Sequence, residues 1–162
     1  MSGASLNCNK KTEINNLSFF SASPFTVRVV PDSPSSSSEK VLKQFFGFDS
    51  FREGQKEIVD SIIAGNDTLA IRSTGSGKSI CFQVPALYFP YLTLIISPLI
   101  SLMSDQVQSL IDKNIQATFI NSSLPQPEIQ KRTQLLKEGK IKLLYLSPEK
   151  LESQKFSQLL TT

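Results

Sequence analysis

Residues 71–82 read IRSTGSGKSICF, and their types suit the binding of phosphate. Gly75 and Gly77 can take a positive φ and let the backbone approach an anion closely, so that successive N–H groups form a nest for phosphate oxygens. Lys78 would then lie between the β- and γ-phosphates of a nucleotide, and the hydroxyl of Ser79 would ligate Mg²⁺. The run Thr74-Gly75-Ser76-Gly77-Lys78-Ser79 predicts a Walker A loop if a strand precedes it and a helix follows.

One position of this loop departs from the standard pattern. The glycine expected five residues before Gly77 is Arg72. That position starts the loop and does not wrap the phosphate, so we expect nucleotide binding to survive the change. The alternative is an ordinary glycine turn before a helix, with Lys78 in solvent.

A second constellation lies upstream in FFGFDSFREGQKEI, residues 45–58, where Phe48, Arg52 and Gln55 fall at i, i+4 and i+7. A glutamine amide carries a donor and an acceptor and can pair with the N6 and N7 edge of adenine, while an aromatic ring can stack on the base. Spacing alone favours a plainer interpretation, a short amphipathic connector with Phe48 in the core.

The elements that must position these residues alternate along the chain. Short apolar runs predict buried strands at residues 68–71, 92–96, 117–120 and 141–146. Segments of helical period lie around them, with apolar stripes at Val41, Leu42, Phe45 and Phe46, at Ile58, Val59, Ile62 and Ile63, and along residues 99–110. This alternation predicts an α/β fold with a parallel sheet and flanking helices.

Each predicted strand ends in a small polar cluster that opens a helix, such as Ser97-Pro98 and Ser147-Pro148. Helix capping explains the residue types, because serine suits the N-cap and proline the first helical position. However, the carboxyl ends of parallel strands share one edge of the sheet, where such folds bind ligands and helix N-termini offer N–H groups to anions. We therefore expect a row of phosphate-binding positions there.

Composition narrows the setting of the protein. The net charge of +3 is too small to indicate nucleic-acid binding by bulk electrostatics. Two cysteines and no histidine suggest neither a disulfide framework nor a zinc site, which favours a reducing, intracellular location, and no apolar run is long enough to span a membrane. Residues 1–38 hold ten serines and predict a flexible tail, with organelle targeting as a weaker alternative.

The order of the motifs resembles that of the RecQ-family ATP-dependent DNA helicases. The segment FGFDSFREGQ resembles their motif 0, STGSGKSICFQVPAL their motif I, SPLISLMSDQV their motif Ia, and LLYLSPEKL a later DNA-contacting motif of the first motor domain. The resemblance covers residues 41–151. It implies that residues 39–162 form part of a RecA-like P-loop NTPase domain, with ATP and Mg²⁺ as cofactors and single-stranded or partially duplex DNA as partner.

The resemblance also implies residue roles. Gln55 and Arg52 would recognise adenine and Phe48 would stack on it, which reverses the interpretation from spacing, and Lys78 would be the catalytic lysine. Residues in segments that line the path of the single strand would be Ser97, Leu99, Ser101, Gln106, Asn121 and Ser147. Their hydroxyl, amide and backbone groups position a strand without reading its sequence and need no strongly basic protein. Two interpretations stay open for the basic residues, additional phosphate contacts or a solvated helix face, and we favour the second; these residues are Lys131, Arg132, Lys137, Lys140 and Lys142.

The chain departs from the family in what it lacks. No Asp-Glu pair occurs in its 162 residues, so the Asp-Glu-x-His motif that positions the attacking water is missing, as are a second motor domain and its arginine finger. The resemblance therefore implies an N-terminal part of a 3′–5′ helicase, negligible hydrolysis by this chain alone, and an incomplete sheet. Two alternatives stay open: a module that binds nucleotide or nucleic acid without turnover, and another P-loop NTPase such as a small kinase.

Overall fold

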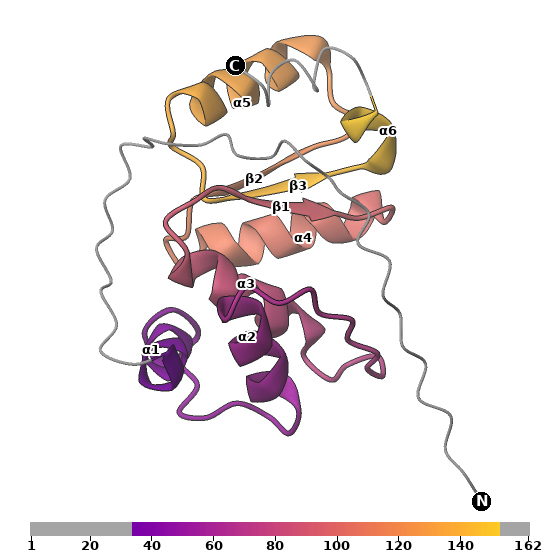
Figure 1. Cartoon of the computed structure of the whole chain (residues 1–162). Coiled ribbons are helices and arrows are strands. Elements are labelled where there is room, and N and C mark those ends of the chain that lie inside the picture. Colours follow the sequence, from indigo (N-terminus) through magenta and orange to yellow (C-terminus); the bar gives the residue numbers. More distant parts are fainter. Residues whose placement is uncertain (1–33, 153–162) are drawn as a thin grey trace, which may run out of the picture.

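The computed structural model describes residues 34–152 of the chain, which form a layered α/β structure (Figure 1). The elements in chain order are α1 (Pro34–Val41), the π-helix η1 (Leu42–Phe46), α2 (Gln55–Ile63), α3 (Lys78–Tyr88), β1 (Thr93–Ile96), α4 (Ile100–Ile111), β2 (Ala117–Ile120), α5 (Gln126–Lys137), β3 (Leu143–Leu146) and α6 (Pro148–Leu151). The predicted strands at residues 92–96, 117–120 and 141–146 are confirmed as β1, β2 and β3.

The strands form a parallel sheet in the order β1-β3-β2. The central strand β3 is buried along its whole length, as expected where helices cover both faces of a parallel sheet. In Figure 1, α5 and α6 lie on one side of the sheet, and α3 and α4 on the other, with α1 and α2 packed beyond α3. The predicted fold class, a parallel sheet with flanking helices, is confirmed.

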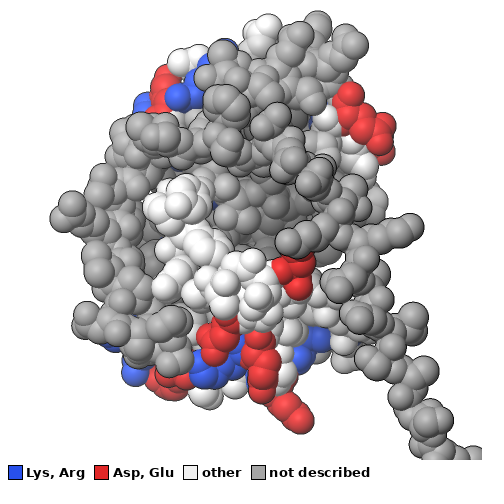
Figure 2. Space-filling view, in the orientation of Figure 1, with Lys and Arg blue, Asp and Glu red and all other residues white. Residues whose placement is uncertain are grey.

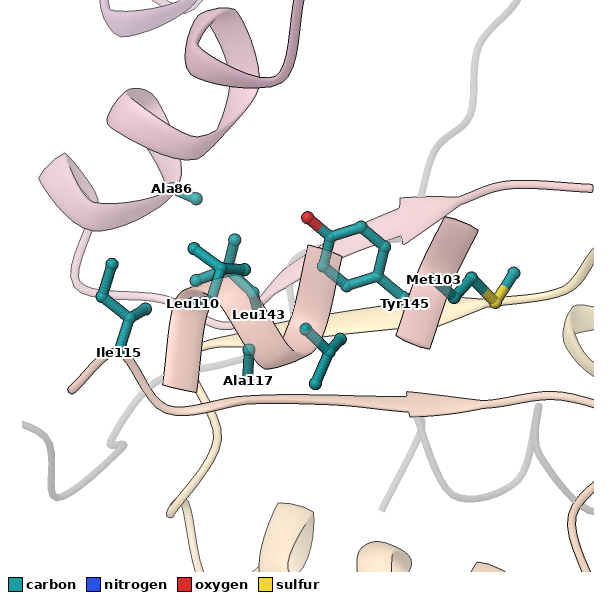
Figure 3. Close-up of a cluster of buried hydrophobic side chains, with 8 residues drawn as sticks. Ala86, Met103, Leu110, Ile115, Ala117, Leu143 and Tyr145 are labelled. Carbon is teal, nitrogen blue, oxygen red and sulfur yellow. The ribbon is translucent and has the colours of Figure 1, made fainter. Parts of the chain in front are cut away.

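Alternate residues of β3 build two separate cores. Leu143 and Tyr145 point toward α4 and pack with Met103, Leu110 and other buried residues (Figure 3). Leu144 and Leu146 instead join the cluster on the side of α5 and α6. This period of two follows from the pleat of the strand, and it fixes which helix faces each side of the sheet.

The strand predicted at residues 68–71 is wrong. These residues form neither helix nor strand, and Leu69 and Ile71 are 89% and 90% exposed. Apolar, β-branched residues form a strand only where another strand pairs with them. The described sheet ends at β1, where Leu94 and Ile96 are also exposed, so residues 68–71 have no partner within it.

The helix starts also differ from the expectation of serine caps. None of the helices α2 to α6 has a side-chain hydrogen bond from its N-cap residue. The Ser97 hydroxyl instead accepts a hydrogen bond from the N–H of Leu99, at 3.3 Å, in the turn before α4. The small polar residues thus shape the turns that follow the strands.

The first described helix, α1, contacts α2 through a hydrogen bond. α1 begins at Pro34, inside the predicted tail, and the buried Ser38 donates a hydrogen bond to the Asp60 carboxylate at 3.2 Å. Residues 1–33 of that tail lie outside the described residues. Within residues 34–152, none of the helices has the length and apolar character that crossing a membrane requires.

Candidate nucleotide and nucleic-acid site

The predicted phosphate loop leads directly into α3. Gly75 and Gly77 have φ values of +78° and +75°, which glycine adopts without steric cost. Gly77 is the N-cap residue of α3, so the first N–H groups of that helix point toward the loop without intrahelical partners. A Cβ atom at Gly75 would meet no heavy atom within 4 Å, so the space beside the loop is open. This arrangement suits an anionic ligand.

The side chain of Lys78 reaches back over the loop. Its Nζ donates hydrogen bonds to the carbonyl oxygens of Ser73 at 2.8 Å and Arg72 at 3.3 Å, while the side chain remains exposed. Phosphate oxygens could replace these carbonyls, because an ammonium group bonds more strongly to an anionic acceptor than to a neutral one. The lysine is therefore held where the predicted nucleotide would lie.

Gln55 is buried against the loop and is only 3% exposed. Its Nε2 donates to the carbonyl oxygens of Gly77 at 3.0 Å and Ser76 at 3.3 Å, and its Oε1 accepts the N–H of Arg52 at 2.9 Å. A glutamine amide has one carbonyl oxygen and one NH₂ group, and both are engaged here. Direct pairing with adenine would require Gln55 to exchange some of these partners.

The other residues predicted to read adenine lie nearer to solvent. Arg52 is exposed and donates from Nη1 to the carbonyl oxygen of Gly75 at 3.4 Å. Phe48 is 49% exposed, so it is not the core residue that spacing alone suggested. The structure thus brings Arg52 and Gln55 onto the phosphate loop and leaves the ring of Phe48 accessible.

A cavity of about 400 Å³ adjoins the loop, and its lining includes Lys78, Ser79, Gln106 and Tyr145. Gln106, which the resemblance places on the path of the nucleic acid, donates from Nε2 to the Ser79 hydroxyl at 3.4 Å. Its Oε1 is buried without a hydrogen-bond partner among the described residues. Gln106 therefore joins α4 to the predicted Mg²⁺ ligand. A single protein hydroxyl suits Mg²⁺, which keeps several waters and is held largely by substrate phosphates.

The remaining residues predicted to contact nucleic acid lie at the carboxyl ends of the three strands. After β1, Leu99 is 58% exposed and Ser101 is exposed, while Ser97 is half-buried. After β2 and β3, Asn121 and Ser147 are buried to 1% exposure. The first group can therefore meet a ligand directly, whereas Asn121 and Ser147 are covered by the rest of the fold.

Asn121 has a polar group still unpaired. Its Oδ1 accepts hydrogen bonds from the N–H and the hydroxyl of Ser123, at 3.1 and 2.8 Å. Its Nδ2 is buried and has no partner among the described residues. Because Ile120 pairs with Leu146 in the parallel ladder, the residues that follow them, Asn121 and Ser147, leave the sheet side by side.

Two residues of the basic cluster, Arg132 and Lys142, have contacts within the fold. Arg132 stacks over the ring of Phe119 at 4.2 Å and bonds Glu128, which lowers the pKa of that carboxyl. Lys142 donates to the carbonyl oxygens of Phe89 and Tyr91, and burial lowers its pKa to about 8. In Figure 2, the visible Lys and Arg side chains are interspersed with Asp and Glu. Arg132 and Lys142 thus have contacts within the fold, whereas Lys131 and Lys137 are exposed.

Comparisons with known proteins agree with this geometry. The sequence profile of the DEAD/DEAH box helicase family matches residues 52–161. The chain is 50% identical over 121 residues to the ATP-dependent DNA helicase RecQ of Haemophilus influenzae, a match that covers 75% of this chain and 20% of the relative. It is 46% identical over 123 residues to the ATP-dependent DNA helicase RecQ of Bacillus subtilis, covering 75% of this chain and 21% of the relative.

A plant relative matches as well. The chain is 42% identical over 117 residues to the ATP-dependent DNA helicase Q-like 5 of Arabidopsis thaliana, covering 72% of this chain and 13% of the relative. At 50% identity, the chain matches two bacterial RecQ relatives and spans only 20% and 19% of their length. The resemblance to RecQ helicases is confirmed.

The fold has a solved counterpart. A hypothetical ATP-dependent RNA helicase from Sulfolobus tokodaii superposes with a TM-score of 0.59 at 17% identity, covering 75% of this chain and 36% of the other. At this identity the match concerns the fold alone, and it agrees with the parallel sheet and flanking helices described above.

Proposed function

We propose that this chain, which belongs to the DEAD/DEAH box helicase family, is part of an ATP-dependent DNA helicase that translocates 3′ to 5′ on a single strand. The observation that carries the proposal is the docking of Arg52 and Gln55 onto a glycine loop that opens α3. The names of the relatives support ATP and DNA as ligands.

The phosphate end of ATP would be bound by the loop and the start of α3. Gly75 and Gly77 let the backbone N–H groups approach the phosphates. Lys78 would release the carbonyls of Arg72 and Ser73 and turn its ammonium group to the β- and γ-phosphates. The hydroxyl of Ser79, held by Gln106, would ligate Mg²⁺. Mg²⁺ would neutralise charge on the phosphates when bound.

The base end would be bound on the side of α2. The exposed ring of Phe48 offers a stacking surface, and Arg52 lies against the loop at Gly75. Gln55 would recognise adenine by exchanging partners with the loop. Since its amide now holds the carbonyls of Ser76 and Gly77, occupation of the base site would also change the support of the phosphate loop.

Single-stranded DNA would pass the carboxyl edge of the sheet. Ser97, Leu99 and Ser101 lie at the start of α4, where free helix N–H groups and hydroxyls can meet a phosphodiester backbone. Asn121 and Ser147 are buried, so we propose that they shape this edge from beneath. Gln106 lies further along α4 and donates a hydrogen bond to Ser79. Through this bond, α4 would connect bound DNA to the proposed Mg²⁺ ligand.

A second function is favoured by one feature of the sequence. The 162 residues contain no Asp-Glu pair that could position a water for attack. We therefore expect this chain by itself to bind Mg²⁺-ATP without hydrolysing it, as a non-hydrolysing binding module would.

Titration calorimetry of the 162-residue chain with Mg²⁺-ATP tests the nucleotide site. Lys78→Ala should weaken binding by at least about tenfold, because a charged hydrogen bond to phosphate is lost. Lys137→Ala serves as the matched control, since this lysine is exposed on α5, across the sheet from α3. Equal affinity of the wild type and Lys78→Ala would refute the assignment of the loop.

A further inference from the structure

The arm that leads into the phosphate loop is not held by the sheet. Residues 64–76 contain no helix or strand, and Leu69 and Ile71 project into solvent. A hydrogen bond between the hydroxyls of Ser61 and Thr68, at 2.9 Å, fixes the beginning of the arm. The end of the arm, next to Gly75, needs another support if the loop is to keep its shape.

Arg72 supplies that support. Its Nη2 donates to the carbonyl oxygen of Glu53 at 2.8 Å, and its Nε donates to the Ser76 hydroxyl at 3.4 Å. The planar guanidinium presents its N–H donors in a fixed fork, so both bonds together define its orientation. The side chain thus spans from the arm to the turn that precedes α2.

The guanidinium also packs directly on that turn. Gly54, with φ of +71°, is the N-cap residue of α2, and a Cβ atom there would lie 2.5 Å from Nη1 of Arg72. The next residue, Gln55, reaches in the opposite direction, to the carbonyls of Ser76 and Gly77. Arg72 thus reaches from the loop to the turn before α2, and Gln55 reaches from that turn back to the loop.

We infer that Arg72 is a positioning residue, which clamps the turn carrying the base-recognising residues to the phosphate loop. This inference rests on the nucleotide site proposed above. Arg72 bonds a main-chain carbonyl and a loop hydroxyl, and it acts on the nucleotide through Gln55 and the loop. The clamp fixes the distance between the base end and the phosphate end of the site. It should therefore matter more for ATP, which bridges both ends, than for a ligand that occupies only the loop.

The experiment compares Arg72→Met and Arg72→Lys with a matched control, Glu53→Ala. The control removes an exposed side chain but keeps the carbonyl that accepts from Arg72. Calorimetry measures the Kd of ATP, GTP and inorganic tripolyphosphate for the 162-residue chain. Arg72→Met should weaken ATP by about tenfold, reduce the preference for ATP over GTP, and weaken tripolyphosphate less than ATP. Arg72→Lys should recover part of the loss, and Glu53→Ala should match the wild type.

Hydrogen exchange without nucleotide gives an independent readout. In Arg72→Met, the hydrogen-bonded amides of Arg52, Gln55 and Ser76 should exchange faster together, while Glu53→Ala leaves their exchange unchanged. Unchanged exchange in Arg72→Met would overturn the clamp. Equal weakening of ATP and tripolyphosphate would also overturn it, since Arg72 would then be a phosphate ligand. Failure of the wild type to bind ATP would refute the proposed function, and the exchange comparison would still decide on the clamp.

Discussion

Replacing Gly77 by alanine tests the contact between the phosphate loop and Gln55. A Cβ atom at Gly77 would lie 2.6 Å from Nε2 of Gln55, and the backbone there has φ of +75°. Gly75 is a matched control, because it has φ of +78° and open space where the Cβ would be. Both substitutions therefore carry a similar backbone strain of about 1–2 kcal/mol, and only Gly77→Ala also meets a side chain.

The additional cost at Gly77 follows from the burial of Gln55. The amide is 3% exposed and cannot turn to water when it is displaced. Loss of its bonds to the carbonyls of Ser76 and Gly77 should cost about 1–3 kcal/mol. We thus expect Gly75→Ala to lower the free energy of unfolding by about 1–2 kcal/mol, and Gly77→Ala by about 2–5 kcal/mol.

Urea denaturation of the nucleotide-free chain, followed by circular dichroism, gives these values. The same glycine substitutions are then made in a Gln55→Ala background, as a double-mutant cycle. Without the amide to displace, Gly77→Ala should cost no more than Gly75→Ala. The reasoning is refuted if the two glycine variants have equal stability in the wild-type background, or if their difference persists without Gln55.

Two further predictions concern Lys142 and Gln106. Burial lowers the pKa of Lys142 from 10.5 to about 8, so between these values the unfolded chain binds more protons and the free energy of unfolding should rise with pH. The rise should be roughly 1 kcal/mol, because part of the ammonium group is screened by solvent. Lys142→Met should lack it in urea denaturation from pH 7.5 to 10.5, and parallel pH profiles would contradict the assignment. Gln106→Ala removes the hydrogen bond to the Ser79 hydroxyl. In calorimetric titrations it should weaken the binding of ATP about threefold in the presence of Mg²⁺ but not in the presence of EDTA. Equal weakening under both conditions would contradict a role of Gln106 at the metal ligand.

Much of the fold could be predicted because its signals are local. The run LLYL at residues 143–146 is apolar at every position, which is typical of a strand buried on both faces, and β3 is indeed the central strand. A phosphate loop can also be proposed from the sequence, since glycine, lysine and serine in the order Gly-x-Gly-Lys-Ser carry their chemistry in consecutive residues. Here the types of the residues suffice to place them.

The contacts that support the loop were beyond such prediction. The acceptors used by Arg72 and Gln55 are main-chain carbonyls of Glu53, Ser76 and Gly77. Every residue has such a carbonyl, so no side-chain pattern indicates which one will be used. Arg72 consequently looked like a departure from the Walker A pattern, although its guanidinium joins two segments of the site. The contact of Gln106 with Ser79 was equally beyond prediction, because it depends on how α4 packs beside α3.

The failed strand at residues 68–71 has a different physical origin. Residues 68–71 are comparable to residues 93–96 in their apolar and β-branched types. Nevertheless, residues 93–96 form β1, whereas residues 68–71 form no strand. The difference is pairing: β1 bonds to β3 along its length, from Thr93 with Leu143 to Ile96 with Leu146. A helix satisfies its backbone within its own segment, whereas a strand depends on a neighbour that may be distant in sequence. Strand propensity is thus necessary for a strand but not sufficient, because a neighbouring strand must also be present. Leu69 and Ile71 are exposed because no strand among the described residues pairs with residues 68–71.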